Sequence, residues 1–173
     1  MRNSRLGCFG ISVLGLTCWV IAPARAYDPA KDTMSDGLAF QVGLAPLRAG
    51  DRDELRIWFM PRNMNGAAGF AGYVVNAKGI KRCRSLTNEL GGSKDGGCDA
   101  ASNPARARRI LDFLPQLSRG GFSQCTVLDG EIVQVEGVAG GAHFDYQLYS
   151  PYNCHAVFKA ISDLTMGDNW RAP

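Results

Sequence analysis

The stretch that decides the fold is residues 132–148, IVQVEGVAGGAHFDYQL, in which two alternating segments flank a pair of glycines. Valines alternate with polar residues before the glycines, and aromatic residues and a leucine alternate with polar residues after them. Successive side chains of a strand point to opposite faces, so this pattern predicts a β-hairpin with one buried and one polar face.

The position of the turn sets the register of this hairpin. Opposed residues in an antiparallel pair have a constant sum of residue numbers, and their side chains share a face. A turn on Ala139-Gly140 places Val135 opposite Phe144 and Val133 opposite Tyr146. A turn on Gly140-Gly141 keeps the same faces and moves every partner by two positions.

The apolar pattern favours a disulfide between Cys125 and Cys154. A turn on Ala139-Gly140 brings Cys125 opposite Cys154, which predicts a disulfide between them, whereas the other turn leaves them two residues out of register. Cys83–Cys98 then follows by elimination, and it encloses a glycine-rich turn. A bulge or a separate turn at Asp129-Gly130 would shift Cys125 and weaken the first pairing.

The first 26 residues have the features of a secretory signal peptide. Arg2 and Arg5 give a charged start, residues 11–22 are apolar, and Ala24-Arg25-Ala26 is a cleavage site of the A-x-A type. A lipid anchor on Cys18 is the weaker alternative, because the residues before it do not match the usual lipidation pattern. We therefore expect a mature chain that is periplasmic or extracellular and has no transmembrane segment.

Removal of residues 1–26 changes the charge and the cysteine count. The full chain has 19 Lys and Arg, 16 Asp and Glu and six cysteines, but three arginines and two cysteines lie in the signal peptide. The mature chain is then formally neutral, which argues against nucleic acid or an anionic membrane as the partner. It keeps four cysteines for an oxidising compartment, where disulfides persist.

The rest of the chain predicts one α+β domain over residues 37–173, after a flexible segment over 27–36. Alternating apolar residues predict strands at 38–44 and 55–60, joined as a hairpin, and a weaker strand pair at 73–75 and 80–86. A flexible loop over 62–72 separates them, because this stretch is rich in Asn, Met and Gly. Together with the hairpin over 132–148, these segments predict an antiparallel sheet of about five to six strands.

Two helices are expected to pack on this sheet. Asn103 can cap the main one, over about 104–117, and Pro104 suits its first position. Pro115 removes a backbone donor, so the regular helix should end or kink near Leu114. A short C-terminal helix is predicted over about 154–164, with Asn153 as its cap.

Basic residues gather along the predicted strand at 80–86. Lys78, Lys81, Arg82 and Arg84 are most simply a solvated strand edge, where such charges discourage aggregation. An anion site is the alternative interpretation of the same charges.

The polar face of the hairpin carries the only candidates for catalysis. His143 and Asp145 share that face with Glu136, and the turn on Ala139-Gly140 places Glu136 opposite His143 and Gln134 opposite Asp145. A carboxylate beside an imidazole can tune a general base. A cross-strand ion pair on a solvated face explains the same residues more simply. The spacing of Cys and His offers no metal-ligand pair, and no nucleotide or cofactor motif is present.

An exposed apolar patch would indicate binding instead of catalysis. Trp58 and Met60 lie on the outward face of their predicted strand, and Met64 lies in the adjoining loop. Such residues form a binding patch if the face is exposed and part of the core if a helix covers it.

The small size, the neutrality and the lack of a catalytic set favour a secreted or periplasmic non-catalytic binding module. We expect an inhibitor, immunity-type or adaptor protein that binds another protein through a sheet face or the 62–72 loop. A small secreted hydrolase that uses His143 with Asp145 or Glu136 is the alternative. A purely structural envelope component is a third.

Overall fold

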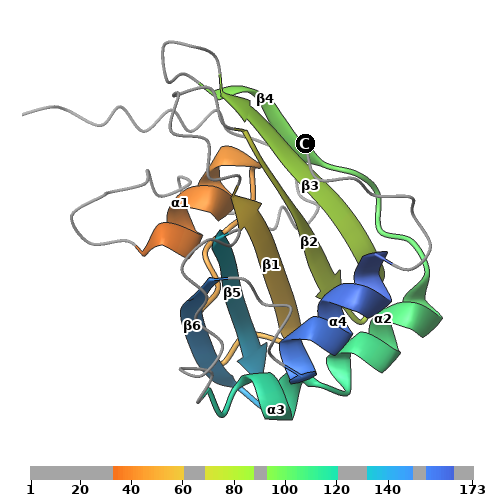
Figure 1. Ribbon diagram of the computed structural model, residues 1–173. Helices are drawn as coiled ribbons and strands as arrows, with labels where there is room; N and C mark the ends of the chain where they lie inside the picture. The colour runs from red at the N-terminus through yellow and green to blue at the C-terminus, as the bar shows by residue number, and fades with distance from the viewer. Residues whose placement is uncertain (1–32, 61–68, 88–92, 121–131, 150–154, 166–173) are drawn as a thin grey trace, which may run out of the picture.

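The computed structural model describes residues 33–60, 69–87, 93–120, 132–149 and 155–165 (Figure 1). It is an α+β fold with one antiparallel sheet, as predicted, and the sheet has six strands in the order β4-β3-β2-β1-β5-β6. The strands are β1 (Glu54–Met60), β2 (Phe70–Asn76), β3 (Gly79–Thr87), β4 (Ser93–Cys98), β5 (Ile132–Ala139) and β6 (Ala142–Tyr149). The helices are α1 (Met34–Gln41), α2 (Pro104–Leu111), α3 (Leu114–Leu117) and α4 (His155–Thr165). The predicted signal peptide lies outside the described residues.

The two faces of the sheet carry separate apolar cores. Side chains from α2, α3 and α4 pack with Leu55, Ile57 and Phe59 of β1 in the larger core. Residues of α1 pack with Trp58 and neighbours from β2 and β3 in the smaller core. Figure 1 shows α2, α3 and α4 grouped together, away from α1. No helix in the described part of the chain is long and apolar enough to cross a membrane.

The strand predicted over residues 38–44 is wrong, because α1 occupies most of this stretch. Thr33 and Asp36 form a capping box, in which each side chain accepts a hydrogen bond from the backbone of the other. Leu38 and Val42 are buried at helical spacing, whereas Phe40 is 53% exposed. An i, i+4 pair fits both periodicities, so the apolar pattern alone favoured the strand. The helix also begins inside the segment predicted to be flexible.

The strand predicted over residues 55–60 is confirmed as β1. Its expected hairpin with residues 38–44 is wrong. β1 pairs with β2 on one side and β5 on the other. The predicted 73–75 and 80–86 pair is confirmed as β2 and β3. β2 begins at Phe70, so the predicted 62–72 loop is too long at its C-terminal end, and residues 61–68 lie outside the described part.

Both predicted helices are present. Asn103 accepts a hydrogen bond from the Arg106 backbone at the start of α2, and the chain then bends between Leu111 and Leu114, where α3 begins just before Pro115. The expected break near Leu114 is thus confirmed. The C-terminal helix is α4, in which Ala160 and Leu164 are buried in the larger core, and its proposed cap Asn153 lies outside the described residues.

The hairpin of β5 and β6 has the predicted faces and a different turn. Ala139 pairs with Ala142, so the turn is on Gly140-Gly141, and both glycines have positive φ, 56° and 82°. A two-residue hairpin turn of this type needs positive φ at both central positions, which Ala139 would adopt only with strain. The turn on Ala139-Gly140 is therefore wrong, and Val135 faces Tyr146 instead of Phe144.

One of the two predicted disulfides is present. Cys83 of β3 is bonded to Cys98 of β4, and the two residues are direct partners across the strands. Cys125 and Cys154 lie outside the described residues, so their disulfide stays a prediction, and it loses the support of the register that favoured it.

Removal of the Cys83–Cys98 disulfide is expected to destabilise the fold. The cysteines are 15 residues apart, and closing a loop of that size is worth about 3 kcal/mol in the chain-entropy model. The double variant Cys83→Ala/Cys98→Ala should therefore lose about 3 kcal/mol in denaturant unfolding monitored by circular dichroism. An unchanged unfolding midpoint would contradict this, and Asp99→Ala, at an exposed position directly after β4, is the control.

Candidate functional site

Polar side chains gather beneath α1, on the face of the sheet formed by β1, β5 and β6. We call this set the polar cluster. It contains the three sequence-predicted candidates for catalysis, and the structure brings them together. Its members are Ser35, Glu54, Arg56, Gln134, Glu136, His143 and Asp145.

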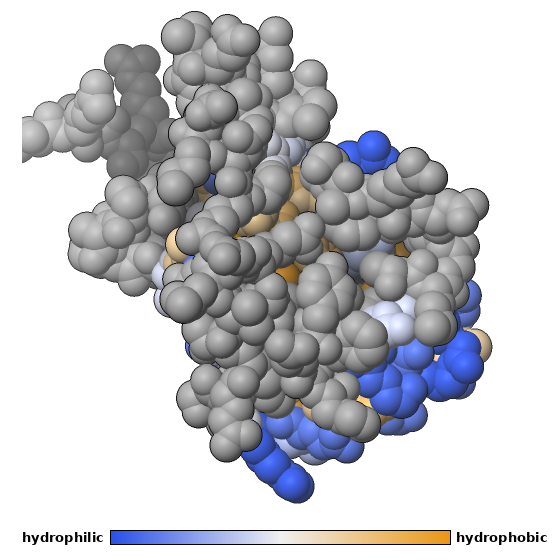
Figure 2. Space-filling view, in the orientation of Figure 1, coloured by the Kyte–Doolittle hydropathy of each residue, from blue (hydrophilic) through white to orange (hydrophobic). Residues whose placement is uncertain are grey.

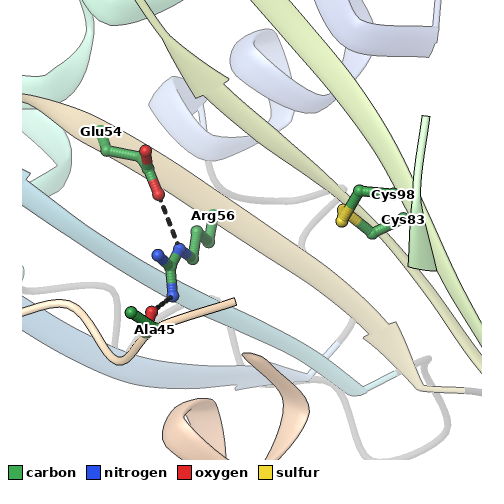
Figure 3. The surroundings of a disulfide bond; sticks show 5 residues. All are labelled: Ala45, Glu54, Arg56, Cys83 and Cys98. Carbon is green, nitrogen blue, oxygen red and sulfur yellow. Dashed lines mark hydrogen bonds and ion pairs between the residues drawn. A yellow bond between two sulfur atoms is a disulfide. The ribbon is translucent and has the colours of Figure 1, made fainter. Parts of the chain in front are cut away.

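Arg56 is the central cation of the polar cluster. Its guanidinium donates to Glu54 Oε1 at 2.8 Å and to the carbonyl of Ala45 at 2.9 Å, as Figure 3 shows. Its Nη1 also lies 3.6 Å from Glu136 Oε2. The Arg56 side chain is only 5% exposed, so it compensates two carboxylates away from solvent.

Glu136 is the most deeply buried carboxylate of the cluster, with no exposed surface. Its Oε1 lies 3.3 Å from Nε2 of His143. Its Oε2 is buried and accepts no hydrogen bond, which leaves the Arg56 charge as its compensation. Burial raises the pKa of Glu136, although the Arg56 charge and the His143 hydrogen bond act in the opposite direction.

Asp145 joins the sheet to α1. It accepts a hydrogen bond from Ser35 Oγ at 2.8 Å, and the Gln134 amide donates to the same carboxylate oxygen. At the other end of α1, Ser85 Oγ of β3 donates to the Gln41 side chain at 3.3 Å. The helix is therefore fastened by side chains from both halves of the sheet.

The actual register changes the partners expected for the candidates. Glu136 directly faces Asp145, and His143 faces Val138, so the predicted pairs of Glu136 with His143 and of Gln134 with Asp145 are not direct Cα partners. Both pairs still form, as diagonal contacts two residues along the strand. They survive because a shift of two residues keeps every side chain on its face.

This arrangement lacks the usual geometry of nucleophilic catalysis. A serine nucleophile needs a base that takes its proton, yet the Ser35 hydroxyl donates to Asp145 while the His143 ring faces Glu136. Ser35 is fully buried, and the His143 side chain is only 24% exposed. The described residues hold no group of three or more His, Cys, Asp or Glu side chains that could bind a metal ion. The polar cluster is thus better suited to holding α1 in place.

Asp36 adds a second ion pair at the start of α1. Arg48 Nη1 lies 2.8 Å from Asp36 Oδ1. Burial alone would raise the pKa of Asp36, but hydrogen bonds from Arg48 and from the Thr33 backbone outweigh it and hold that pKa below its ordinary value. The ionised form is therefore favoured in the folded state.

The stabilisation from Asp36 is expected to disappear in acid. Because the pKa is lowered on folding, its contribution is complete above the ordinary value of 3.8 and is lost as the pH falls through the folded-state value. Asp36→Asn should therefore be less stable than the wild type at about pH 7, with the difference shrinking below about pH 4. Urea unfolding at several pH values measures this. A difference that grows in acid would contradict it, and Asp99→Asn, at an exposed position away from α1, is the control.

The structure places Trp58 in the core. It is fully buried and packs edge to face on Phe70, with ring centroids 5.5 Å apart. α1 covers this side of the sheet, so Trp58 cannot serve in an exposed binding patch. Met60 is half-buried against the same core, and Met64 lies outside the described residues.

Gly72 explains how the Trp58 indole fits against the sheet. A Cβ at position 72 would lie 2.4 Å from Trp58 Cε3 and 2.6 Å from the Ile57 carbonyl oxygen. The absence of a side chain there lets the indole lie directly over β2.

A second candidate site is a set of cations around α2 and β3, which we call the arginine face. It consists of Lys78, Arg82, Arg84, Arg106, Arg108 and Arg109. Arg82 pairs with Tyr73, whose side chain is in the larger core, so Arg82 lies on the same face as α2. Figure 2 shows strongly hydrophilic residues gathered at the lower right, over α2. Within the described part of the chain, Arg84, Arg108 and Arg109 form no ion pair.

The explanation of these cations as a strand edge is wrong. β3 lies between β2 and β4, and β4 forms the edge. Arg84, Arg108 and Arg109 are nevertheless exposed, and one guanidinium nitrogen of Arg106 is buried without a hydrogen-bond partner. Arg84, Arg108 and Arg109 thus offer donors that no described acidic side chain satisfies.

A cavity of about 430 Å³ lies between the α2–α3 bend and the β5–β6 turn. Its lining includes Asp53, Asp112, Leu114, Ser118 and Gly140. Asp53 already accepts a hydrogen bond from the Gly140 backbone at 2.8 Å. None of the predicted catalytic residues lines this cavity.

The sequence pointed to His143, Asp145 and Glu136 but missed Ser35 and Arg56. Ser35 fell in a segment predicted to be flexible, although the Thr33 to Asp36 capping signal was present beside it. Arg56 appeared only as a polar residue on the outer face of its strand.

Comparison with known proteins assigns no family, because no family model matches the chain and no curated protein is significantly similar to it.

Proposed function

We propose that the protein is a secreted or periplasmic binding module without catalytic activity, and that it binds an acidic surface of another protein through the arginine face. The observation that carries the proposal is a group of exposed arginines, Arg84, Arg108 and Arg109, that form no ion pair within the described part of the chain. In a mature chain that is formally neutral, a local excess of cations favours a partner of complementary charge. A disulfide in the described fold is compatible with an oxidising compartment.

The surfaces expected from the sequence are less suitable. In the described residues, helices pack on both faces of the sheet, and most of the 62–72 loop lies outside the described part. The arginine face requires neither an uncovered sheet face nor the 62–72 loop. Its cations lie on a helix and a strand that pack together, so binding would need little rearrangement.

The test compares two double variants that each remove two positive charges from exposed positions. The purified protein is immobilised and exposed to nuclease-treated periplasmic or extracellular extract, and saturable capture is measured at several salt concentrations. Arg108→Gln/Arg109→Gln should reduce capture at least tenfold, because charge complementarity controls encounter and specificity. Arg52→Gln/Arg119→Gln removes the same charge from exposed positions elsewhere and should bind as wild type. Equal capture by both double variants, or capture that salt does not weaken, would overturn the proposal.

The hydrolase is the second candidate, and one observation favours it: His143, Asp145 and Glu136 do converge. If it is correct, His143→Ala should abolish a hydrolytic activity and leave the melting temperature unchanged. A loss of stability without any activity to lose would assign His143 a structural role. An envelope component that is purely structural would show neither capture nor hydrolysis.

A further inference from the structure

The geometry of the β5–β6 hairpin leaves one set of backbone groups on β6 facing outward. A two-residue turn is closed by a residue pair that exchanges both backbone hydrogen bonds, here Ala139 and Ala142. Such pairs alternate along an antiparallel ladder, so Phe144, Tyr146 and Leu148 point their backbone groups toward β5.

The intervening residues, His143, Asp145 and Gln147, therefore direct their N–H and C=O groups away from the sheet. Within the described part of the chain, none of the three makes a backbone hydrogen bond to a turn, loop or neighbouring segment. β6 is the last strand of the sheet order, so among the described residues these groups form an unpaired sheet edge.

The two edges of the sheet differ in how they are protected. β4 is short and has a register shift in its pairing with β3. Each of these features is known to discourage strand addition at an edge. β6 has eight regularly paired residues with no register shift, no proline and no lysine or arginine. Among the described residues, the β4 edge is thus less suited to strand addition than the β6 edge.

We propose that the β6 edge pairs with the β6 edge of a second copy of this chain, antiparallel and about a two-fold axis at Tyr146. This register aligns residues 143–149 of both copies and adds about eight backbone hydrogen bonds. The proposal does not depend on the arginine face, which lies near the opposite edge of the sheet.

The side chains of β6 are self-complementary in this register. Asp145 lies opposite Gln147 of the other copy, so a carboxylate meets an amide, and Phe144 lies opposite Leu148. The rings of Phe144 and Tyr146 already stack within one chain, with centroids 5.9 Å apart, and the axis brings two such stacks together. Centring the axis on Asp145 instead would place two carboxylates in direct opposition, which is unfavourable.

The test is the mass of the purified protein by sedimentation over a range of concentrations. We expect a weak, concentration-dependent dimer, because strand pairing at one edge buries less than about 1,200 Å². Gln147→Pro removes an outward N–H that β5 does not use, so it should give a monomer with an unchanged melting temperature.

Charge variants at the exposed Gln147 test the register itself. Gln147→Asp places an acid opposite Asp145 of the other copy and should weaken the dimer at least tenfold, whereas Gln147→Lys should strengthen it. Gln116→Asp, on an exposed helix position, is the control and should leave the dimer unchanged. A wild type that stays monomeric at every concentration, or a dimer that Gln147→Pro does not disrupt, would overturn the proposal. A complex with a different protein that Gln147→Pro abolishes, without self-association, would also overturn it by assigning the edge to another partner.

Discussion

Replacing Arg56 with methionine is expected to lower the free energy of unfolding by about 3 to 5 kcal/mol, the usual effect of removing one partner of a buried ion pair. Arg56 is almost fully buried. It donates hydrogen bonds to Glu54 and to the carbonyl of Ala45, and it forms an ion pair with Glu136. Methionine keeps the apolar length of the side chain but leaves the Glu136 charge without compensation. Urea unfolding at about pH 7 measures the loss.

The pH dependence separates this explanation from a simple packing defect. Burial raises the pKa of Glu136 on folding, so its ionisation costs stability as the pH rises through the folded-state value. Without Arg56 that pKa should rise further, and protonation at about pH 4 should relieve much of the loss. A loss that stays constant with pH would contradict the electrostatic cause.

Two further variants complete the test of Arg56. Arg56→Met/Glu136→Leu removes the cation together with its buried partner and should recover part of the stability. Arg52→Met, at an exposed position two residues before β1 begins, should change the free energy of unfolding by less than about 0.5 kcal/mol. If Arg56→Met were as mild as Arg52→Met, the polar cluster would contribute nothing to stability.

Replacing Trp58 with alanine is expected to cost about 3 to 5 kcal/mol, as for other large aromatic side chains in a core. The indole is fully buried between α1 and the sheet, against Phe70 and over Gly72. Its removal leaves a cavity that the rigid sheet beneath it cannot fill. Denaturant unfolding followed by far-ultraviolet circular dichroism measures the effect.

The control for Trp58 is Met34→Ala in the same part of the fold. Met34 is 51% exposed at the start of α1, and its truncation should cost less than about 0.5 kcal/mol. A Trp58→Ala variant that unfolds like the wild type would return Trp58 to the surface patch considered from the sequence.

Elements with strong local signals were predicted well from the sequence. Asn103, Pro104 and Pro115 mark the start and the break of the main helix through backbone chemistry that needs no distant contact. The alternation of apolar and polar residues in the β5–β6 hairpin predicted its two faces, because successive side chains of any strand point to opposite faces. α1 was missed because its apolar residues fit two periodicities, and only the capping box at Thr33 and Asp36 decides between them.

The candidate site was harder to predict because its contacts are distant in sequence. His143, Asp145 and Glu136 share a face of one hairpin, so their convergence follows from the local pattern. Arg56 reaches Glu136 only because β1 pairs with β5, and no local signal specifies that pairing. Ser35 reaches Asp145 only because α1 packs on the same face.

The pairing of β1 with β5 also has a consequence for how the chain folds. Every other strand pair in the sheet joins strands that are consecutive in the chain, whereas β1 and β5 are separated by β2, β3, β4, α2 and α3. Closing so long a loop costs entropy before its contacts form, and such non-local pairings slow folding. The β1–β4 meander and the β5–β6 hairpin should therefore form early, and their docking along β1 and β5 should set the folding rate. Substitutions that weaken the hairpin or the seam would then mainly slow folding, whereas substitutions at contacts that form after docking would mainly speed unfolding.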